Sequence, residues 1–273
     1  AMSTIGTCGF STYDDSTMHF HNLPFELWTA LFMFLAGGSF SLYYRAYVKG
    51  PAVILRNTEF RTYLGIVLVA MLLIALNLIL SMGMDGGMAA RVAVFQVTSL
   101  STTGFVSADF ETWPTFSKMV LLLLMVIGGC AGSTASGIKV ARLILLVRNA
   151  RAVVLQKLNP NRVVDITLTG AHVDGAMLLR VGTFFFLYLA VIFVTAFLLA
   201  MDGLLPFDAV AVAITTIGNI GPAFGIVSAT STYAPLSDFS KAILCLTMLL
   251  GRLEIFTLLI LLQPSFWRRT YRW

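Results

Sequence analysis

Apolar residues in this chain form long and short runs that alternate with polar loops. A helix needs about 20 predominantly apolar residues to cross a bilayer, whereas runs of about ten residues are too short to span and suit re-entrant half-helices. The long runs are 24–44, 63–82, 116–147, 181–201 and 241–262, and the short ones are 91–100 and 207–217. This pattern predicts an all-α membrane protein in which spans and half-helices alternate.

A nine-residue phrase rich in Ser, Thr and Gly occurs three times, at 3–11, 98–106 and 215–223. Its closing glycines align, and a Phe and a Gly separated by 12 residues follow each copy. An internal repeat of this kind decides the architecture. We therefore expect pseudo-repeats of span, half-helix, polar loop and span: 1–61 as the second half of a truncated repeat with no half-helix, 62–175 as a complete repeat, and 176–273 as the final repeat with a basic C-terminus. The chain is expected to be part of a longer protein.

The repeated phrase has the composition of a loop that lines a cation pore. Backbone carbonyls can replace the hydration shell of K⁺ when the chain is extended around the ion, and glycine permits the dihedrals that this needs. A half-helix that ends just before the loop directs its partial negative charge at the ion. The alternative is an ordinary surface turn, in which Ser, Thr and Gly are common.

Charge predicts the orientation in the membrane. The chain is 58% hydrophobic and 11% charged, with a mean hydropathy of +0.87 and a net charge of +5. Most of its Lys and Arg residues fall in 45–61, 139–180 and 268–272, which the positive-inside rule places in the cytoplasm. The phrases and acidic residues such as Asp14 then lie on the extracytoplasmic side. The basic residues are not interleaved with stacking aromatics, so nucleic-acid binding is excluded.

The third long run is interrupted at bilayer depth. All ten residues of 128–137 are Gly, Ala, Ser, Thr or Cys, and four of them are Gly. Glycine disfavours a helix by about 1 kcal/mol relative to Ala, and irregular backbone in a membrane must be buried in protein or line a water-filled cavity. We expect a movable loop beneath the pore loops. Close helix packing through small residues is the alternative.

Two charges interrupt the last long run. Arg252 and Glu254 follow about ten mostly apolar residues, and a charge at the bilayer centre costs about 2.5–3.5 kcal/mol. Residues two positions apart on a helix do not face each other, so Arg252 needs a partner elsewhere. The carbonyls of the interrupted segment or a water-lined pore would supply it.

The sequence gives little support to an enzymatic function. The glycines at 132 and 137 have phosphate-loop spacing, but the following Lys comes one residue late and no Ser or Thr follows it. No His falls inside a predicted span, where an intramembrane protease would need a base. We expect no enzyme activity and no cofactor.

The three phrases, the stretch 128–139 and the motifs LGRLEIF at 250–256 and QPSFWR at 263–268 resemble the membrane subunit of bacterial Trk potassium uptake systems. The resemblance implies four repeats around a central pore in the bacterial inner membrane, a homodimer, and a cytoplasmic nucleotide-binding regulatory subunit. It implies that K⁺ binds at the carbonyls of Thr7, Cys8, Gly9, Thr102, Thr103, Gly104, Asn219, Ile220 and Gly221. Gating residues would be Gly128, Gly129, Gly132, Ser133, Thr134, Ser136, Gly137 and Arg252.

The function expected from this resemblance is K⁺ uptake through a carbonyl-lined filter above an intramembrane gating loop. The alternative is a non-conducting fragment or accessory membrane subunit that packs against a complete pore. The sequence leaves open whether flux is channel-like or a symport coupled to H⁺ or Na⁺, because it shows no intramembrane Asp or His relay.

Overall fold

The computed structural model describes residues 1–13, 15–20, 22–160 and 164–267, and its regular structure is almost entirely helical. Two helices are long and apolar enough to cross a membrane, α5 (Thr58–Met82) and α9 (Gly175–Met201). The other helices are α1 (Met2–Ile5), α2 (Leu23–Gly37), α3 (Phe40–Lys49), α4 (Ala52–Arg56), α6 (Gly86–Thr102), α7 (Thr115–Ile127), α8 (Val140–Leu158), α10 (Pro206–Ile217), α11 (Asp238–Arg252), α12 (Ile255–Leu262) and α13 (Pro264–Trp267). Three 3₁₀ turns, η1 (Ser16–Phe20), η2 (Phe110–Thr112) and η3 (Gly225–Val227), and a hairpin of β1 (Thr167–Leu168) and β2 (Ala171–His172) complete it. The prediction of an all-α fold is confirmed.

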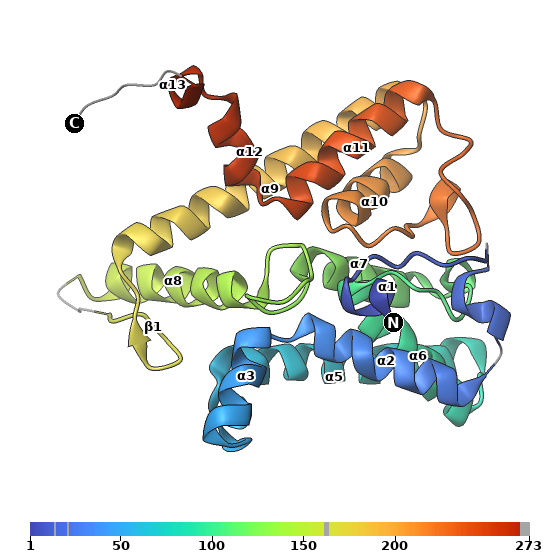
Figure 1. Ribbon diagram of the computed structural model, residues 1–273, viewed down its shortest axis with the longest axis horizontal. Helices are drawn as coiled ribbons and strands as arrows, with labels where there is room; N and C mark the ends of the chain where they lie inside the picture. The colour runs from blue at the N-terminus through green and yellow to red at the C-terminus, as the bar shows by residue number, and fades with distance from the viewer. Residues whose placement is uncertain (14, 21, 161–163, 268–273) are drawn as a thin grey trace.

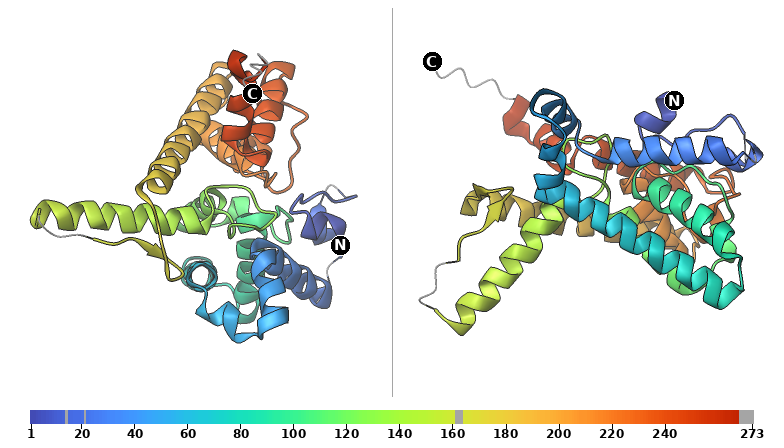
Figure 2. Two further views of the ribbon diagram at one scale, coloured as in Figure 1. Left: turned by 60° about the vertical axis from the view of Figure 1, so that its left-hand side comes forward. Right: turned by 90° about the horizontal axis from the view of Figure 1, so that it is seen from below.

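The helices form two groups with irregular backbone between them. Helices α2, α3, α5 and α6 lie on one side, and α9, α10, α11 and α12 lie on the other (Figure 1). The short helix α1 and the segment after α7 lie between the two groups, as the left-hand view of Figure 2 also shows. Helix α8 projects away from the body. This arrangement brings the ends of several helices together at the centre of the molecule.

Local capping fixes where the central helices begin. The side chain of Asn57 accepts a hydrogen bond from the Phe60 amide at 3.0 Å and starts α5. Asp85 accepts from two amides in the first turn of α6, and Pro206 occupies the first turn of α10, where its missing N–H leaves no bond unmade. Large apolar side chains on the outer faces of α5 and α9 are exposed, such as Leu80 (82%) and Phe193 (79%). Such faces suit contact with lipid.

Two of the predicted spans are not single straight helices, although each bent pair of helices is together long and apolar enough to cross a membrane. The run 24–44 bends by 92° between α2 and α3, and the run 241–262 bends by 109° between α11 and α12. At the first bend the Tyr43 hydroxyl donates to the Leu35 carbonyl at 2.9 Å, and the same carbonyl accepts from the Gly38 amide at 3.1 Å. At the second, Glu254 has a left-handed φ of 58°.

One of the two predicted half-helices is longer than the apolar run that predicted it. Helix α6 begins several residues before the apolar run 91–100. The side chain of Asp85 caps its first turn, which lies outside the apolar run. Helix α10 matches its prediction closely. The first unit was expected to have no half-helix, yet Met2–Ile5 forms a helical turn before the first polar loop.

The interruption of the third run is present. Helix α7 ends at Ile127 and α8 begins at Val140, two residues later than the expected restart at 138. Several residues used to orient the chain, Asp14, Arg162, Arg268, Arg269 and Arg272, lie outside the described residues.

Candidate functional site: three polar loops above an interrupted helix

Each copy of the repeated phrase begins as the last turn of a helix and continues as a loop. Helices α1 and α10 end at the equivalent residues Ile5 and Ile217, whereas α6 continues two aligned positions further, to Thr102. The last carbonyls of a helix have no partner within it and carry its partial negative charge. Three helix C-termini therefore supply partial negative charge at the loops.

The loops share backbone features that their glycines make possible. Gly9, Gly104 and Gly221 have φ of 65°, 100° and 109°. In the first and third copies the residue two positions earlier is also left-handed, with Thr7 at 52° and Asn219 at 51°. In the middle copy the longer helix replaces this turn. The sequence alignment of the three glycines thus corresponds to a shared conformation.

Hydroxyl side chains brace every loop, a role that the sequence reasoning missed. In each copy a Ser or Thr near the start of the phrase donates to the carbonyl of the residue that follows the closing glycine. These bonds are Ser3 Oγ to Phe10 O at 3.0 Å, Ser99 Oγ to Phe105 O at 2.5 Å and Thr215 Oγ1 to Pro222 O at 2.9 Å. The recurrence of a hydroxyl residue in the first two positions of the phrase was the available signal.

The loops lie against one another in order. A Cβ placed on Gly9 would lie 2.5 Å from the carbonyl oxygen of Thr103, and one on Gly104 would lie 1.7 Å from that of Ile220. No described residue comes within 4 Å of the corresponding position on Gly221. Each of the first two glycines therefore faces a carbonyl of the next loop, at distances that no larger residue tolerates.

The interrupted segment, residues 128–139, folds back on itself between its glycines. A Cβ on Gly128 would lie 2.2 Å from the Ser136 carbonyl, and one on Gly137 would lie 3.3 Å from the Gly128 Cα. Gly128, Gly132 and Gly137 all have positive φ, at 71°, 77° and 90°. The segment is a closed loop whose two ends meet where α7 and α8 meet.

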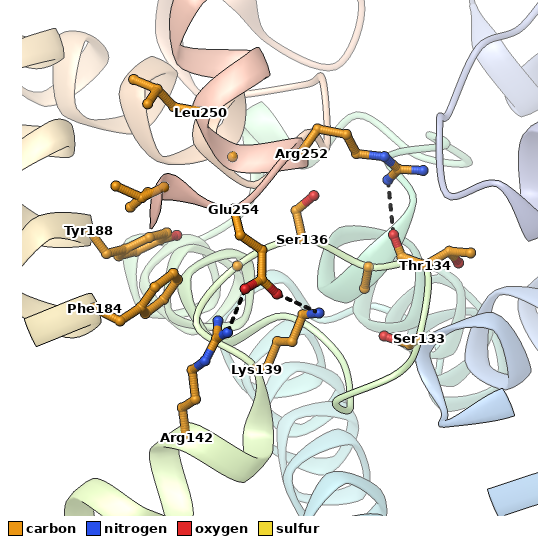
Figure 3. Close-up of a pocket in the computed structure, with 14 residues that line it drawn as sticks. Ser133, Thr134, Ser136, Lys139, Arg142, Phe184, Tyr188, Leu250, Arg252 and Glu254 are labelled. Atoms are coloured by element: carbon orange, nitrogen blue, oxygen red, sulfur yellow. Dashed lines mark hydrogen bonds and ion pairs between the residues drawn. The ribbon is translucent and has the colours of Figure 1, made fainter. Parts of the chain in front are cut away.

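Thr134 joins the interrupted segment to the first polar loop through hydrogen bonds. Its hydroxyl donates to Ile5 O at 2.8 Å, and its carbonyl accepts from the Thr7 hydroxyl at 2.9 Å. The Arg252 guanidinium donates to the same Thr134 carbonyl at 2.9 Å and to Gly6 O at 3.1 Å (Figure 3). Arg252, which is exposed in this chain, thus has backbone carbonyls as partners, one of them in the interrupted segment.

The other predicted site residues are only partly brought together. The Asn219 amide donates to Met248 O at 3.1 Å and lies 3.5 Å from the Ser136 hydroxyl. The hydroxyls of Thr102 and Thr103 lie 3.0 Å apart and bond to each other. Gly129 packs on the far side of the loop from Thr134, where a Cβ would lie 2.6 Å from the Gly37 carbonyl.

A cluster around Glu254 was not expected from the sequence. Its carboxylate accepts from Lys139 Nζ at 3.3 Å and Arg142 Nη2 at 2.8 Å, and the Arg142 guanidinium stacks over the Phe184 ring at 4.0 Å. Lys139 and Glu254, both with positive φ, directly precede α8 and α12. The cluster lines a cavity of about 220 Å³ together with Ser136 (Figure 3). Sequence reasoning had treated both lysine and arginine as cytoplasmic flanking charges.

A family model described as TrkH, cation transport protein, matches residues 1–269. The chain belongs to this family. It is 35% identical over 272 residues to the Trk system potassium uptake protein TrkH of Salmonella typhimurium, covering 98% of this chain and 56% of that protein. The Escherichia coli TrkH is 34% identical over 275 residues, with the same coverage. The chain therefore spans about half the length of the curated TrkH proteins that it matches.

The fold agrees with a solved TrkH structure. The crystal structure of the potassium transporter TrkH from Vibrio parahaemolyticus superimposes with a TM-score of 0.90 and 34% sequence identity, over 97% of this chain and 57% of that chain. This TrkH-family chain is an all-helical membrane protein, as predicted.

Proposed function

We propose that this chain forms three sides of the pore of a TrkH-type potassium uptake protein. The observation that carries the proposal is the convergence of the polar loops, in which Gly9 faces the Thr103 carbonyl and Gly104 faces the Ile220 carbonyl. The loops follow the C-termini of α1, α6 and α10, whose partial charge favours a cation. A ring of carbonyls can replace the hydration shell of K⁺. The fourth side would come from a further repeat, outside this chain, that fills the space next to Gly221.

The ion-binding oxygens in this proposal are the carbonyls before and at each aligned glycine. The hydroxyl braces support this assignment, because they bind the carbonyl after each glycine rather than the proposed ion-binding carbonyls. The Gly221 carbonyl differs from the rest of the set, since it accepts a hydrogen bond from the Tyr233 hydroxyl. K⁺ would bind at carbonyls of Thr7, Cys8, Gly9, Thr102, Thr103, Gly104, Asn219, Ile220 and Gly221.

The interrupted segment is proposed as the gate. It consists of small residues, closes on itself at Gly128 and Gly137, and reaches the first polar loop through Thr134 and Arg252. A loop that lies under the filter and is held there by a few hydrogen bonds can block ions in one position and release them in another. Gly129, Gly132, Ser133 and Ser136 complete the gating set.

The remaining proposals concern the setting of the pore. We place it in the bacterial inner membrane, with the polar loops extracytoplasmic and the basic segments cytoplasmic. A homodimer and a cytoplasmic nucleotide-binding regulatory subunit follow from the Trk resemblance. Helix α8 carries the basic residues Arg151 and Lys157 in its second half and projects from the body, which suits contact with such a regulator. The repeat boundaries 1–61, 62–175 and 176–273 are part of this proposal.

Ion flux tests the proposal directly. The full-length protein, with its N-terminal repeats, is reconstituted in liposomes, and Rb⁺ uptake is measured in competition with K⁺ and Na⁺. We expect uptake that K⁺ inhibits far better than Na⁺, and no selective conductance from residues 1–273 alone. A well-folded full-length protein without Rb⁺ uptake would instead support an accessory subunit that packs against another pore.

A further inference from the structure

The interrupted segment has two limbs with different attachments. The first limb, residues 129–132, is bonded to the bend between α2 and α3. The Cys130 amide donates to the Gly37 carbonyl at 2.8 Å, and the Phe40 amide donates to the Gly132 carbonyl at 3.2 Å. Both bonds join backbone to backbone, and Cys130 is 1% exposed. This limb is fastened to helices that do not belong to the interrupted span.

Glu59 provides a further attachment for the first limb. It lies in the first turn of α5, yet its carboxylate accepts a hydrogen bond from the amide of Ala131. An acidic residue in a first helical turn ordinarily interacts with the N-terminus of its own helix. Here Asn57 already caps α5 through the Phe60 amide, so the carboxylate is available to the loop.

Groups of the loop and of the helix that follows it interact with the Glu59 carboxylate. The backbone of Ala141, in the first turn of α8, also interacts with the carboxylate, and Lys139 is close enough to interact electrostatically. One side chain thus contacts the loop at Ala131 and the helix that resumes after it. A carboxylate that accepts several hydrogen bonds holds its donors more strongly than a neutral acceptor does.

In the described part of the chain, no backbone hydrogen bond joins the second limb, residues 133–137, to α2, α3 or Glu59. Ser133 bonds back to the Cys130 carbonyl, and the Thr134 hydroxyl reaches the Ala36 carbonyl only at 3.5 Å. The shorter contacts of Thr134 run to the first polar loop and to Arg252. Gly132 and Gly137, both at positive φ, lie at the two ends of this limb. Positions that only glycine adopts readily are where a backbone can change direction. The division between a fixed and a movable part therefore falls at Gly132.

We infer that Glu59 is a positioning residue for the gate, which anchors the first limb so that opening is confined to residues 133–137. The inference rests on the proposed gating function of the segment. Without the carboxylate, the whole segment is released from α5 and the closed position loses its fixed end. The gate then opens without the rupture of the contacts at Thr134.

The native thiol of Cys130 reports on this anchor independently of ion flux. In the full-length protein in liposomes, the modification rate of Cys130 by N-ethylmaleimide is measured by mass spectrometry, with the exposed Cys245 as internal reference. Glu59→Ala should raise the Cys130 rate by about tenfold or more, as the loss of a hydrogen bond to a charged group implies. Rb⁺ uptake should rise and depend less on the regulator. Glu59→Gln keeps an acceptor oxygen and should restore both properties largely to the wild-type values.

Three further variants separate anchoring from general damage. Asn57→Ala removes the α5 cap without touching the loop, and should lower the melting temperature while leaving the Cys130 rate unchanged. Arg252→Ala releases the second limb, and should raise flux while leaving the Cys130 rate unchanged. If Glu59→Ala does not insert stably, Glu59→Asp serves instead, because its shorter side chain keeps the charge but loses the reach to Ala131.

Two results would overturn the inference. One is an unchanged Cys130 rate in an inserted, well-folded Glu59→Ala or Glu59→Asp protein. The other is a Glu59→Gln protein in which Cys130 is modified as fast as in Glu59→Ala, which would show that hydrogen bonding to Ala131 is not what holds the first limb. Failure of the gating proposal looks different: the Cys130 rate would respond to Glu59 variants while Rb⁺ uptake would not.

Discussion

Replacing Gly104 by serine places a side chain where two filter loops meet. A Cβ at this position would lie 1.7 Å from the Ile220 carbonyl oxygen, and real Cβ atoms essentially never come within 3.0 Å of such a neighbour. The loops would have to separate by more than an ångström. The left-handed φ of 100° adds backbone strain of about 1–3 kcal/mol for a residue other than glycine. The Thr103 and Ile220 carbonyls would then no longer surround the ion together.

The matched control is Gly203→Ser, in the turn between α9 and α10. Gly203 has a similar φ of 94°, but nothing lies within 4 Å of its Cβ position. Both full-length variants should lose stability from the backbone strain, measured as melting temperature. Only Gly104→Ser should lose selectivity, with the preference for K⁺ over Na⁺ falling about tenfold, equivalent to about 1.4 kcal/mol. Competition of K⁺ and Na⁺ with Rb⁺ uptake measures the ratio.

An unchanged competition ratio in a folded Gly104→Ser protein would refute this reasoning. It would mean either that the loops part without affecting the ion or that the Thr103 and Ile220 carbonyls do not bind it. Equal losses of selectivity in both variants would also count against a local effect, since Gly203 lies outside the three polar loops.

Three further predictions follow from polar contacts. Arg252→Ala removes the donors to Thr134 and should raise Rb⁺ flux and weaken its dependence on the regulator; lower flux with regulation intact would contradict a latch. Asp202 accepts hydrogen bonds from two serines, which lower its pKa below the ordinary 3.8. The ionised carboxylate therefore stabilises the folded protein at neutral pH, and this stabilisation disappears as the pH falls through the lowered pKa. Asp202→Asn should reduce the melting temperature at pH 7 but not at the most acidic pH that the protein tolerates. Glu26→Gln breaks the paired hydrogen bonds to Arg91 at 2.7 and 2.8 Å and should destabilise the protein by about 1.5–3 kcal/mol, and a double-mutant cycle with Arg91→Ala should show coupling.

Features with a local cause could be predicted from the sequence. The interruption after Ile127 follows from ten consecutive small residues, and the short half-helix α10 follows from an apolar run too short to span. The partner of Arg252 could be narrowed to a few candidates because a charge at bilayer depth needs hydrogen-bonding groups. In these cases the sequence contained both the anomaly and the chemistry that resolves it.

Features that depend on distant residues could not be predicted. The bend between α2 and α3 falls at Gly37, Gly38 and Ser39, which are a local signal for a helix break, but its stabilising contacts come from Tyr43 and from the interrupted segment, which the local sequence does not indicate. The pairing of Glu254 with Lys139 and Arg142 joins residues of two repeats that lie more than a hundred positions apart in the sequence. The bond from Ala131 to Glu59 spans 72 residues. Single-sequence reasoning has no measure of such proximity.

The three polar loops share the positive φ of their closing glycines but not their sequence, with Thr-Cys-Gly, Thr-Thr-Gly and Asn-Ile-Gly before and at the aligned position. In a pore assembled from four identical subunits, one codon change alters every side of the ring at once. In the proposed pore, the three sides that this chain supplies are encoded separately, so a change at one glycine leaves the other two intact. Mutation can therefore adjust the free energy of ion binding in single steps rather than in fourfold steps, and each side can diverge while its neighbours hold the ring together.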